Sequence, residues 1–200
     1  MEDALRENDL RWGDPVFLRA FKQEKILELW VLHRGSGAFR LFRSYPIAAQ
    51  SGGPGPKLAE GDGQVPEGFY FVSRRGMKPD SNYHLAFNIG YPNAFDLHHR
   101  RAGSLIMVHG GRASVGCLAM TDPGIEEIYS LCDAALAGGQ RFFRVHVFPF
   151  RMTQTRIEQA KGHRWEDFWL NLRQGYDWFE THRVPPNVTL GNGQYVFTKN

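Results

Sequence analysis

A histidine and a cysteine, His109 and Cys117, lie eight residues apart in the segment LIMVHGGRASVGCLAM, residues 105–120. The glycines and small residues between them allow the chain to fold back and bring the two side chains together. A thiol attacks a carbonyl as its thiolate, which a neighbouring imidazole generates by accepting the proton or forming an ion pair. The pair therefore predicts a thiol made anionic by His109, although the same residue types also occur in structural loops.

The other cysteine and histidines do not indicate a metal centre. Cys132 falls on the apolar face of a predicted helix, where a cysteine is most simply a small buried hydrophobe. His98 and His99 are adjacent, and in a strand they would point to opposite faces. No zinc-type spacing joins them to His109 and Cys117. The sequence predicts no metal site, no cofactor and no disulfide framework.

Composition predicts an ordinary folded protein. The 200 residues are 42% apolar and carry 24 basic against 21 acidic side chains, a net charge of +3. Basic pairs at 74–75 and 100–101 are too short for the basic face of a nucleic-acid binder. No apolar run approaches the length of about 18 residues that spans a bilayer. The composition argues against nucleic acid and membrane partners, and a mildly basic surface suits an anionic polymer such as a cell-wall glycan.

Short apolar runs separated by turn residues predict the strands that position the pair. The Gly- and Pro-rich stretch at 51–64 predicts an exposed loop between them. The pattern predicts an α+β fold, mainly an antiparallel β-sandwich or barrel with flanking helices. The expected strands lie at residues 15–21, 25–33, 38–47, 68–75, 83–90, 104–109 and 141–150, with an edge strand at 193–197.

Two helices are predicted. The first begins at Asp122, which can cap it, has Pro123 in its first turn and ends at Gly138. The second covers residues 164–182, and its aromatic stripe is expected to pack on the sheet rather than line a ligand site. The stripe consists of Trp165, Phe168, Trp169, Leu172, Tyr176 and Phe179. We expect a catalytic domain at 1–150 and a helical C-terminal extension at 151–200 packed on it.

The segment HGGRASVGCLAM resembles the active-site segment of the L,D-transpeptidases, the YkuD-type catalytic domains. A histidine followed by glycine, His109 and Gly110, precedes a Ser-x-Gly-Cys signature at Ser114, Gly116 and Cys117. The His-to-Cys spacing is shorter than is usual in the family. A valine also stands where many members have a polar residue.

Both departures are similar to the YafK-like branch of that family, which has a short HG…SVGC.AMTD form. The segments YHLAFNIGYPNAFD at 83–96 and PEGFYFV at 66–72 also resemble this branch. The resemblance covers roughly residues 15–150 and implies the fold of an L,D-transpeptidase catalytic domain. The tail from 151 onwards matches only loosely.

The resemblance implies a cysteine acyltransferase that acts on peptidoglycan stem peptides. Cys117 would attack the carbonyl that links the L-centre of meso-diaminopimelate to the terminal D-residue, and His109 would move the protons. Backbone N–H groups around Gly116 and Cys117 are the candidates for stabilising the oxyanion. Ser114 either hydrogen-bonds the imidazole or substrate, or only stabilises the turn.

Further residues are expected to bind the substrate. Arg112 offers a fork for a stem-peptide carboxylate, or is a solvated loop arginine. Outward side chains just before the motif either line a groove or lie at an ordinary sheet edge. The residues expected to bind substrate are Gly110, Arg112, Tyr83, His84, Asn88 and Tyr91.

The implied partners are peptidoglycan stem peptides and a wall-anchored lipoprotein. The acceptor decides the outcome: an amine gives a cross-link or attachment, and water gives hydrolysis, the outcome associated with the YafK-like branch. Because the wall lies outside the cytoplasmic membrane, we expect a periplasmic or wall-associated protein whose export signal is missing from residues 1–9. A catalytically inactive peptidoglycan binder of the same fold and a peptidase for protein substrates are the alternatives.

Overall fold

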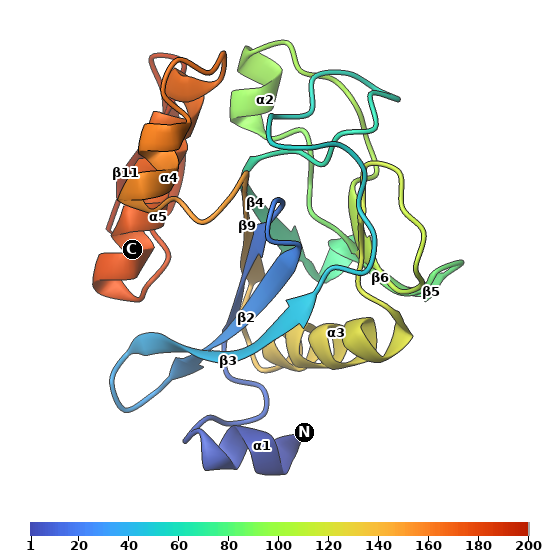
Figure 1. Cartoon of the computed structure of the whole chain (residues 1–200). Helices are drawn as coiled ribbons and strands as arrows, with labels where there is room; N and C mark the ends of the chain where they lie inside the picture. The colour runs from blue at the N-terminus through green and yellow to red at the C-terminus, as the bar shows by residue number, and fades with distance from the viewer. Residues whose placement is uncertain (200) are drawn as a thin grey trace.

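Two sheets and a separate hairpin form the β structure of residues 1–199, which the computed structural model describes (Figure 1). The five-stranded sheet has the order β3-β2-β1-β9-β4, and the four-stranded sheet has the order β5-β6-β7-β8. Their strands are β1 (Val16–Phe21), β2 (Ile26–His33), β3 (Ala38–Pro46), β4 (Gly68–Ser73), β5 (Met77–Ser81), β6 (His84–Asn88), β7 (Met107–His109), β8 (Leu118–Ala119) and β9 (Phe142–Phe148). The prediction of an α+β fold is confirmed, and each of the seven predicted internal runs contains a strand.

The central strand β1 is antiparallel to β2 and parallel to β9. All six of its residues are buried, because helices or the second sheet cover both faces of the five-stranded sheet. Such a strand is a continuous apolar run rather than an alternating one. The antiparallel pairing of β1, β2 and β3 agrees with the mainly antiparallel fold that the sequence predicts. The parallel β1–β9 pair is not predicted, since apolar runs alone do not reveal which distant strand lies alongside.

Helix α3 (Asp122–Ala137) covers one face of the five-stranded sheet, where Ile125 and Ile128 join the main core. Cys132 is fully buried on the same helix face, as predicted. The helix is capped by Thr121, whose hydroxyl accepts a hydrogen bond from Gly124 N at 3.3 Å. Asp122 is therefore the first helical residue and not the cap, and its carboxylate is used elsewhere.

Helix α5 (Glu166–His182) covers the opposite face with its aromatic stripe, as predicted (Figure 1). The ring of Phe179 lies 4.7 Å from that of Phe17 and 4.9 Å from that of Trp30, centroid to centroid. Trp169, Leu172, Tyr176 and Phe179 are buried, and Trp165 and Phe168 are partly buried against the same cluster. The stripe is core, because its rings fill the space above β1 and β9.

One charged side chain, Arg19, lies in the core between α5 and the five-stranded sheet. Its guanidinium forms ion pairs with Glu28 at 2.9 Å and with Glu180 of α5 at 2.6 Å, and it lies over the ring of Phe179 at 4.7 Å. Because Arg19 and Glu28 are almost fully buried, each needs the other to offset its loss of hydration. The pairing ties α5 to the centre of the sheet.

The C-terminal segment contains a hairpin as well as helices. After α4 (Gln154–Gln159) and α5, the strands β10 (Asn187–Gly191) and β11 (Gln194–Thr198) pair only with each other. The strand predicted at 193–197 therefore exists, but it does not extend the edge of the large sheet. Asn171 of α5 donates to Tyr195 O and accepts from Tyr195 N, at 2.9 and 2.8 Å, which fixes the hairpin to the helix.

The adjacent histidines lie on a helix and not on a strand. His98 ends α2 (Ala94–His98), a short helix whose N-terminus is closed by reciprocal bonds between Asn93 and Asp96. The remaining short helices are α1 (Glu2–Glu7) and the 3₁₀ turn η1 (Arg74–Gly76). Within residues 1–199, none of the helices has the length and apolar character to cross a bilayer.

The packing of α5 predicts the effect of truncating its most buried ring. Phe179→Ala should lower the free energy of unfolding by about 3–5 kcal/mol, because a large cavity remains under the helix. Leu170→Ala on the same helix, at a side chain that is 40% exposed, should change it by less than about 0.5 kcal/mol. Urea unfolding followed by circular dichroism measures both, and equal losses in the two variants would contradict this packing.

Candidate active site

A short parallel pairing brings Cys117 and His109 together. β7 and β8 pair in parallel, with Val108 opposite Leu118 and His109 opposite Ala119. Parallel strands usually need a connection of about a dozen residues or more, whereas here residues 110–117 suffice because two glycines, Gly111 and Gly116, adopt positive φ angles of 76° and 79°. Cys117 thus lies just before β8, beside β7, and His109 ends β7.

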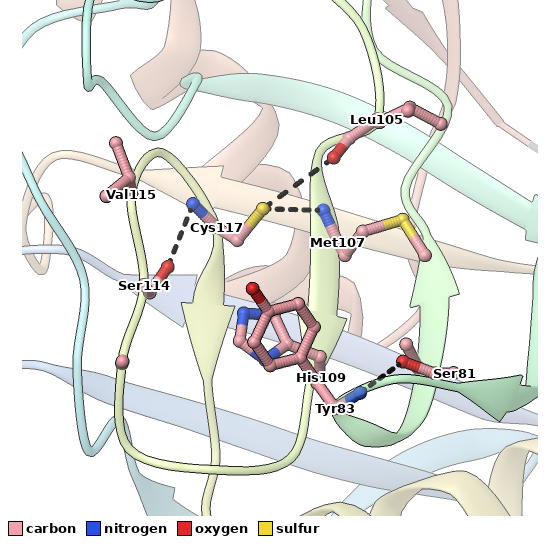
Figure 2. A pocket seen from close by; sticks show the side chains of 10 residues that line it. Ser81, Tyr83, Leu105, Met107, His109, Ser114, Val115 and Cys117 are labelled. Carbon is pink, nitrogen blue, oxygen red and sulfur yellow. Dashed lines mark hydrogen bonds between the residues drawn. The ribbon is translucent and has the colours of Figure 1, made fainter.

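Both side chains line one pocket, which Figure 2 shows from close by. The pocket has a volume of about 390 Å³, within the range of small-molecule sites. Its floor comes from β6 and β7, and its rim comes from the loop before Cys117. The lining residues are Ser81, Tyr83, Ala86, Leu105, Met107, His109, Ala113, Ser114, Val115 and Cys117.

The sulfur of Cys117 lies against the backbone of β7 and the residues before it. Met107 N–H donates to Sγ at 3.3 Å, and the thiol donates to Leu105 O at 3.6 Å (Figure 2). Burial raises the pKa of this thiol, and the Met107 N–H and the charge of Lys57 partly oppose the rise. The Met107 amide is therefore a fixed donor that stabilises the sulfur when it becomes negative.

The imidazole of His109 is held in one orientation. Its Nδ1 lies 2.6 Å from Gly110 O, and a carbonyl can only accept, so Nδ1 carries the proton. Nε2 is then the unprotonated nitrogen, and it has no hydrogen-bond partner among residues 1–199. The ring of Tyr83 lies 4.8 Å away, centroid to centroid, and covers the imidazole (Figure 2). Burial lowers the pKa of His109, which keeps the ring neutral.

Burial shifts the pKa values of Cys117 and His109 in opposite directions. A raised thiol pKa and a lowered imidazole pKa both favour a neutral thiol beside a neutral imidazole. The thiol that the sequence analysis expects to be anionic is thus disfavoured at rest, because burial penalises each charged form. Nε2 of His109 remains available as an acceptor in the same pocket.

The two backbone amides proposed for the oxyanion are hydrogen-bonded to serine hydroxyls. Ser114 Oγ accepts from Cys117 N at 3.1 Å, which folds the turn before the nucleophile. Ser51 Oγ, from the distant 51–64 stretch, accepts from Gly116 N at 2.7 Å. Ser114 therefore supports the turn and does not contact the imidazole, and Ser51 is a residue that the sequence analysis missed.

Gly110 is required by close packing. A Cβ at this position would lie 2.7 Å from Tyr83 O and 2.7 Å from the carboxylate of Asp122. That carboxylate accepts from Gly111 N at 2.8 Å, so the start of α3 anchors the loop between His109 and Cys117. Because Gly110 has no side chain, Tyr83 O and the Asp122 carboxylate can lie this close to it. Asp122 hydrogen-bonds the loop and does not cap the helix.

Three of the eight non-glycine residues with positive φ in the described part of the chain lie near the pair. His84, Leu105 and Thr121 have positive φ angles of 71°, 53° and 65°, which side-chain-bearing residues rarely adopt. Leu105 O accepts from the Cys117 thiol, and Thr121 follows β8. Each such conformation costs of order 1–3 kcal/mol and persists only where surrounding contacts enforce it.

The structure brings only part of the expected substrate-binding set to the pocket. Tyr83 lines it, whereas exposed Arg112 lies on the loop outside the lining. His84 pairs with Glu126 at 2.7 Å. Asn88 caps a turn by accepting from Gly90 N at 2.9 Å. Tyr91 is buried and donates to Lys57 O at 3.1 Å, so only Tyr83 of the four residues just before the motif lines the pocket.

A second pocket of about 270 Å³ adjoins the first and shares Leu105, Val115 and Cys117 with it. Part of its wall comes from the stretch at 51–64, which the sequence predicts to be an exposed loop. The stretch contains no helix or strand, but Gly55 and Lys57 are buried, so that expectation is wrong in part. The lining residues are Lys57, Glu60, Gly61, Gly63, Ser104, Leu105, Ile106, Val115, Gly116 and Cys117.

No group of three or more His, Cys, Asp or Glu residues within residues 1–199 is arranged to hold a metal ion. His99 instead approaches Gly193 O at 2.7 Å, at the turn of the C-terminal hairpin. His98 lies beside it, at a ring distance of 5.1 Å. These histidines join α2 to the hairpin.

Comparisons with known proteins agree on one family. The model of the YkuD L,D-transpeptidase catalytic domain matches residues 28–158. The chain is 46% identical over 187 residues to a protein named "Putative L,D-transpeptidase YafK" of Escherichia coli strain K12, covering 94% of the chain and 75% of that protein. The corresponding protein of Escherichia coli O157:H7 matches equally.

Two solved structures share the fold. The crystal structure of the helical cell shape determining protein Pgp2 from Campylobacter jejuni superposes with a TM-score of 0.54 at 19% identity, covering 90% of this chain and 74% of that one. Its K307A mutant gives a TM-score of 0.53 at 24% identity, covering 74% of this chain and 54% of that one. At these identities the likeness concerns the fold alone.

The electrostatics of the pair predict how Cys117 reacts with iodoacetamide. The rate should rise with pH to a midpoint above the ordinary thiol value of about 8.5, because only the thiolate reacts and burial disfavours it. In His109→Ala the midpoint should move little, since the neutral imidazole contributes no charge. Peptide mass spectrometry of Cys117 across a pH series measures both. A midpoint below neutrality that rises in His109→Ala would instead reveal a preformed ion pair.

Proposed function

The chain belongs to the YkuD family of L,D-transpeptidase catalytic domains, and on that basis we propose that it is a cysteine acyltransferase of the bacterial cell wall. The observation that carries the proposal is the pocket that Cys117 shares with His109, whose Nε2 is left free by the bond from Nδ1 to Gly110 O. A nucleophile, an oriented base and an adjacent open cavity are the minimum for acyl transfer. The substrate is a peptidoglycan stem peptide.

In the first half-reaction, Cys117 Sγ attacks the carbonyl carbon that joins the L-centre of meso-diaminopimelate to the D-residue. His109 Nε2 takes the thiol proton as the S–C bond forms. The C–N bond then breaks, and the imidazolium returns that proton to the departing amine. The Met107 N–H stabilises the sulfur while it is negative. The product is a thioester on Cys117.

In the second half-reaction, an amine or water attacks the thioester carbonyl and gives its proton to His109. The C–S bond breaks, and the sulfur recovers the proton from the imidazolium. An amine from another stem peptide yields a cross-link, and the lysine of a wall-anchored lipoprotein yields an attachment. Water cleaves such links, and similarity to the YafK-like branch favours this hydrolytic release. The two adjoining pockets that meet at Cys117 have room for the acyl donor and the acceptor.

Stabilisation of the oxyanion needs donors that are preorganised at the carbonyl oxygen. The amides of Gly116 and Cys117 lie next to the sulfur but donate to Ser51 and Ser114. We assign them this task with the serine bonds kept: each N–H is shared between its serine oxygen and the substrate oxygen. Tyr83, on the rim above His109, contacts the bound peptide. Arg112, on the exposed loop, meets a stem-peptide carboxylate from outside the pocket.

The reaction takes place outside the cytoplasmic membrane, where peptidoglycan lies. A role in cell shape follows from action on the wall, and the Campylobacter jejuni protein of the same fold is described as determining helical cell shape. The competing hypothesis is an inactive peptidoglycan binder of this fold. It predicts a Cys117 thiol no more reactive toward iodoacetamide than the fully buried Cys132.

The nucleophile assignment predicts that Cys117→Ala abolishes turnover of purified muropeptides and leaves the fold intact. Cys132→Ala, at the other cysteine, should retain turnover because that thiol lies in the core away from the pocket. Mass spectrometry of muropeptides, with and without an added amine, reports hydrolysis and transfer separately. Incubation with casein tests a general peptidase. Product formation by Cys117→Ala would overturn the assignment.

The base assignment predicts that His109→Ala slows acylation by about 10²–10⁴-fold. In this variant the sulfur remains beside Met107 N, so Cys117 should still be alkylated. Single-turnover kinetics with a muropeptide measure acylation, and the alkylation rate serves as the control for an accessible thiol. Acylation at the wild-type rate would show that another group accepts the proton.

A further inference from the structure

One buried network connects helix α5 to the turn that carries Cys117. We propose that Ser51, Glu67 and Trp169 are positioning residues, which hold the stretch at 51–64 so that Ser51 fixes the Gly116 amide beside the nucleophile. The expected effect on turnover rests on the proposed function. The hydrogen bonds that support the inference do not depend on any substrate. It gives the proposed C-terminal extension, residues 151–200, a role in the catalytic site.

Next to the nucleophile, the network consists of one hydroxyl group, that of Ser51. Ser51 Oγ accepts from Gly116 N at 2.7 Å and donates to Gly63 O at 2.6 Å. One side chain therefore joins the turn before Cys117 to both ends of the 51–64 stretch. Gly63 and Gly116 also line the second pocket, so this stretch forms a wall next to the sulfur. A displacement of the stretch would be transmitted to Gly116.

The 51–64 stretch has no helix or strand, so its backbone groups depend on side chains for hydrogen bonds. Lys22 Nζ donates to Gly55 O at 2.6 Å and to Val65 O at 2.7 Å. Glu67 Oε1 accepts from Gly55 N at 2.6 Å and from Lys22 Nζ at 3.1 Å. These two charged side chains thus hold Gly55, inside the stretch, and Val65, directly after it.

This ion pair is fully buried, and both side chains have no exposed surface. Burial lowers the pKa of Lys22, and the charge of Glu67 opposes that fall. Removing one partner of such a pair leaves an uncompensated charge in the interior, which is strongly destabilising. The pair holds the segment in place, because opening of the stretch would break the bonds from both charged groups to Gly55 and leave buried groups unpaired.

Helix α5 completes the network through Trp169. Its indole Nε1–H donates to the second oxygen of Glu67, Oε2, at 2.8 Å, and the residue is 3% exposed. Trp165, one turn earlier, packs so closely on Gly55 that a Cβ there would lie 2.9 Å from its Nε1. Neither tryptophan lines a pocket that contains Cys117. Their effect on the site must therefore act through Glu67 and the stretch.

Hydrogen exchange measured by mass spectrometry tests the connection without a substrate. Trp169→Phe keeps the ring and removes the donor to Glu67. It should accelerate exchange about threefold or more in the peptides that cover 51–64 and 113–118, while β1 and α3 keep their wild-type rates. Trp178→Phe, on the same helix but stacked on His182, is the matched control and should leave both peptides unchanged.

Ser51→Ala tests the last link with a smaller change. Loss of the acceptor should accelerate exchange of the Gly116 amide about fivefold, and Ser51→Thr, which keeps the hydroxyl, should restore it. On muropeptides, Ser51→Ala should lower kcat about tenfold or more with KM within about twofold, because a misplaced nucleophile slows chemistry more than binding. Alkylation of Cys117 should not slow.

The outcomes separate this inference from the proposed function. Unchanged exchange at 113–118 in both Trp169→Phe and Ser51→Ala, with the fold intact, would overturn the positioning network whatever the activity. If Trp169→Phe accelerates exchange throughout the chain, the role of Trp169 is structural only, which also overturns it. The predicted local pattern supports the network even if muropeptides are not turned over, a result that would count against the proposed function alone.

Discussion

The candidate site depends on the parallel pairing of two very short strands, β7 and β8. Only the register that sets His109 opposite Ala119 places the sulfur of Cys117 beside Met107 N and inside the pocket of the imidazole. Strands this short gain little from their own hydrogen bonds. Their pairing is stabilised from outside, by β6 on one side, by the Asp122 carboxylate on the loop and by Ser51 on the turn.

Burial governs the chemistry of the site. It favours the neutral forms of both Cys117 and His109, so both side chains are uncharged before substrate binds. The fixed groups around it are arranged for the charged forms: an amide points at the sulfur, and a carbonyl holds the imidazole by Nδ1. Dipoles that are already oriented suit the proton transfer that we propose between Cys117 and His109.

Local patterns in the sequence predicted most of the elements. The aromatic stripe of α5 and the short apolar runs of the strands give direct signals, because each reflects a surface that must be buried. The His109–Cys117 pair was also predictable, since glycines permit the return of the chain. The parallel β1–β9 pair, the separate hairpin of β10 and β11, and the Ser51–Gly116 bond were not. The β1–β9 pair and the Ser51–Gly116 bond join residues distant in sequence, and no periodicity records which partner a strand or hydroxyl will find. The hairpin is local, but an apolar run does not show whether its strand joins the large sheet or pairs only with its neighbour.

The proposed reaction requires that a stem peptide acylates Cys117, and the acylated protein can be trapped. A muropeptide reaction is quenched over the first turnover, digested and searched by mass spectrometry for a thioester on the peptide that contains Cys117. We expect a transient adduct on Cys117 that has the mass of the stem acyl group without its terminal D-residue. This adduct should disappear as product forms. Product formation with Cys117 unmodified throughout, or an acyl group on another side chain, would contradict it.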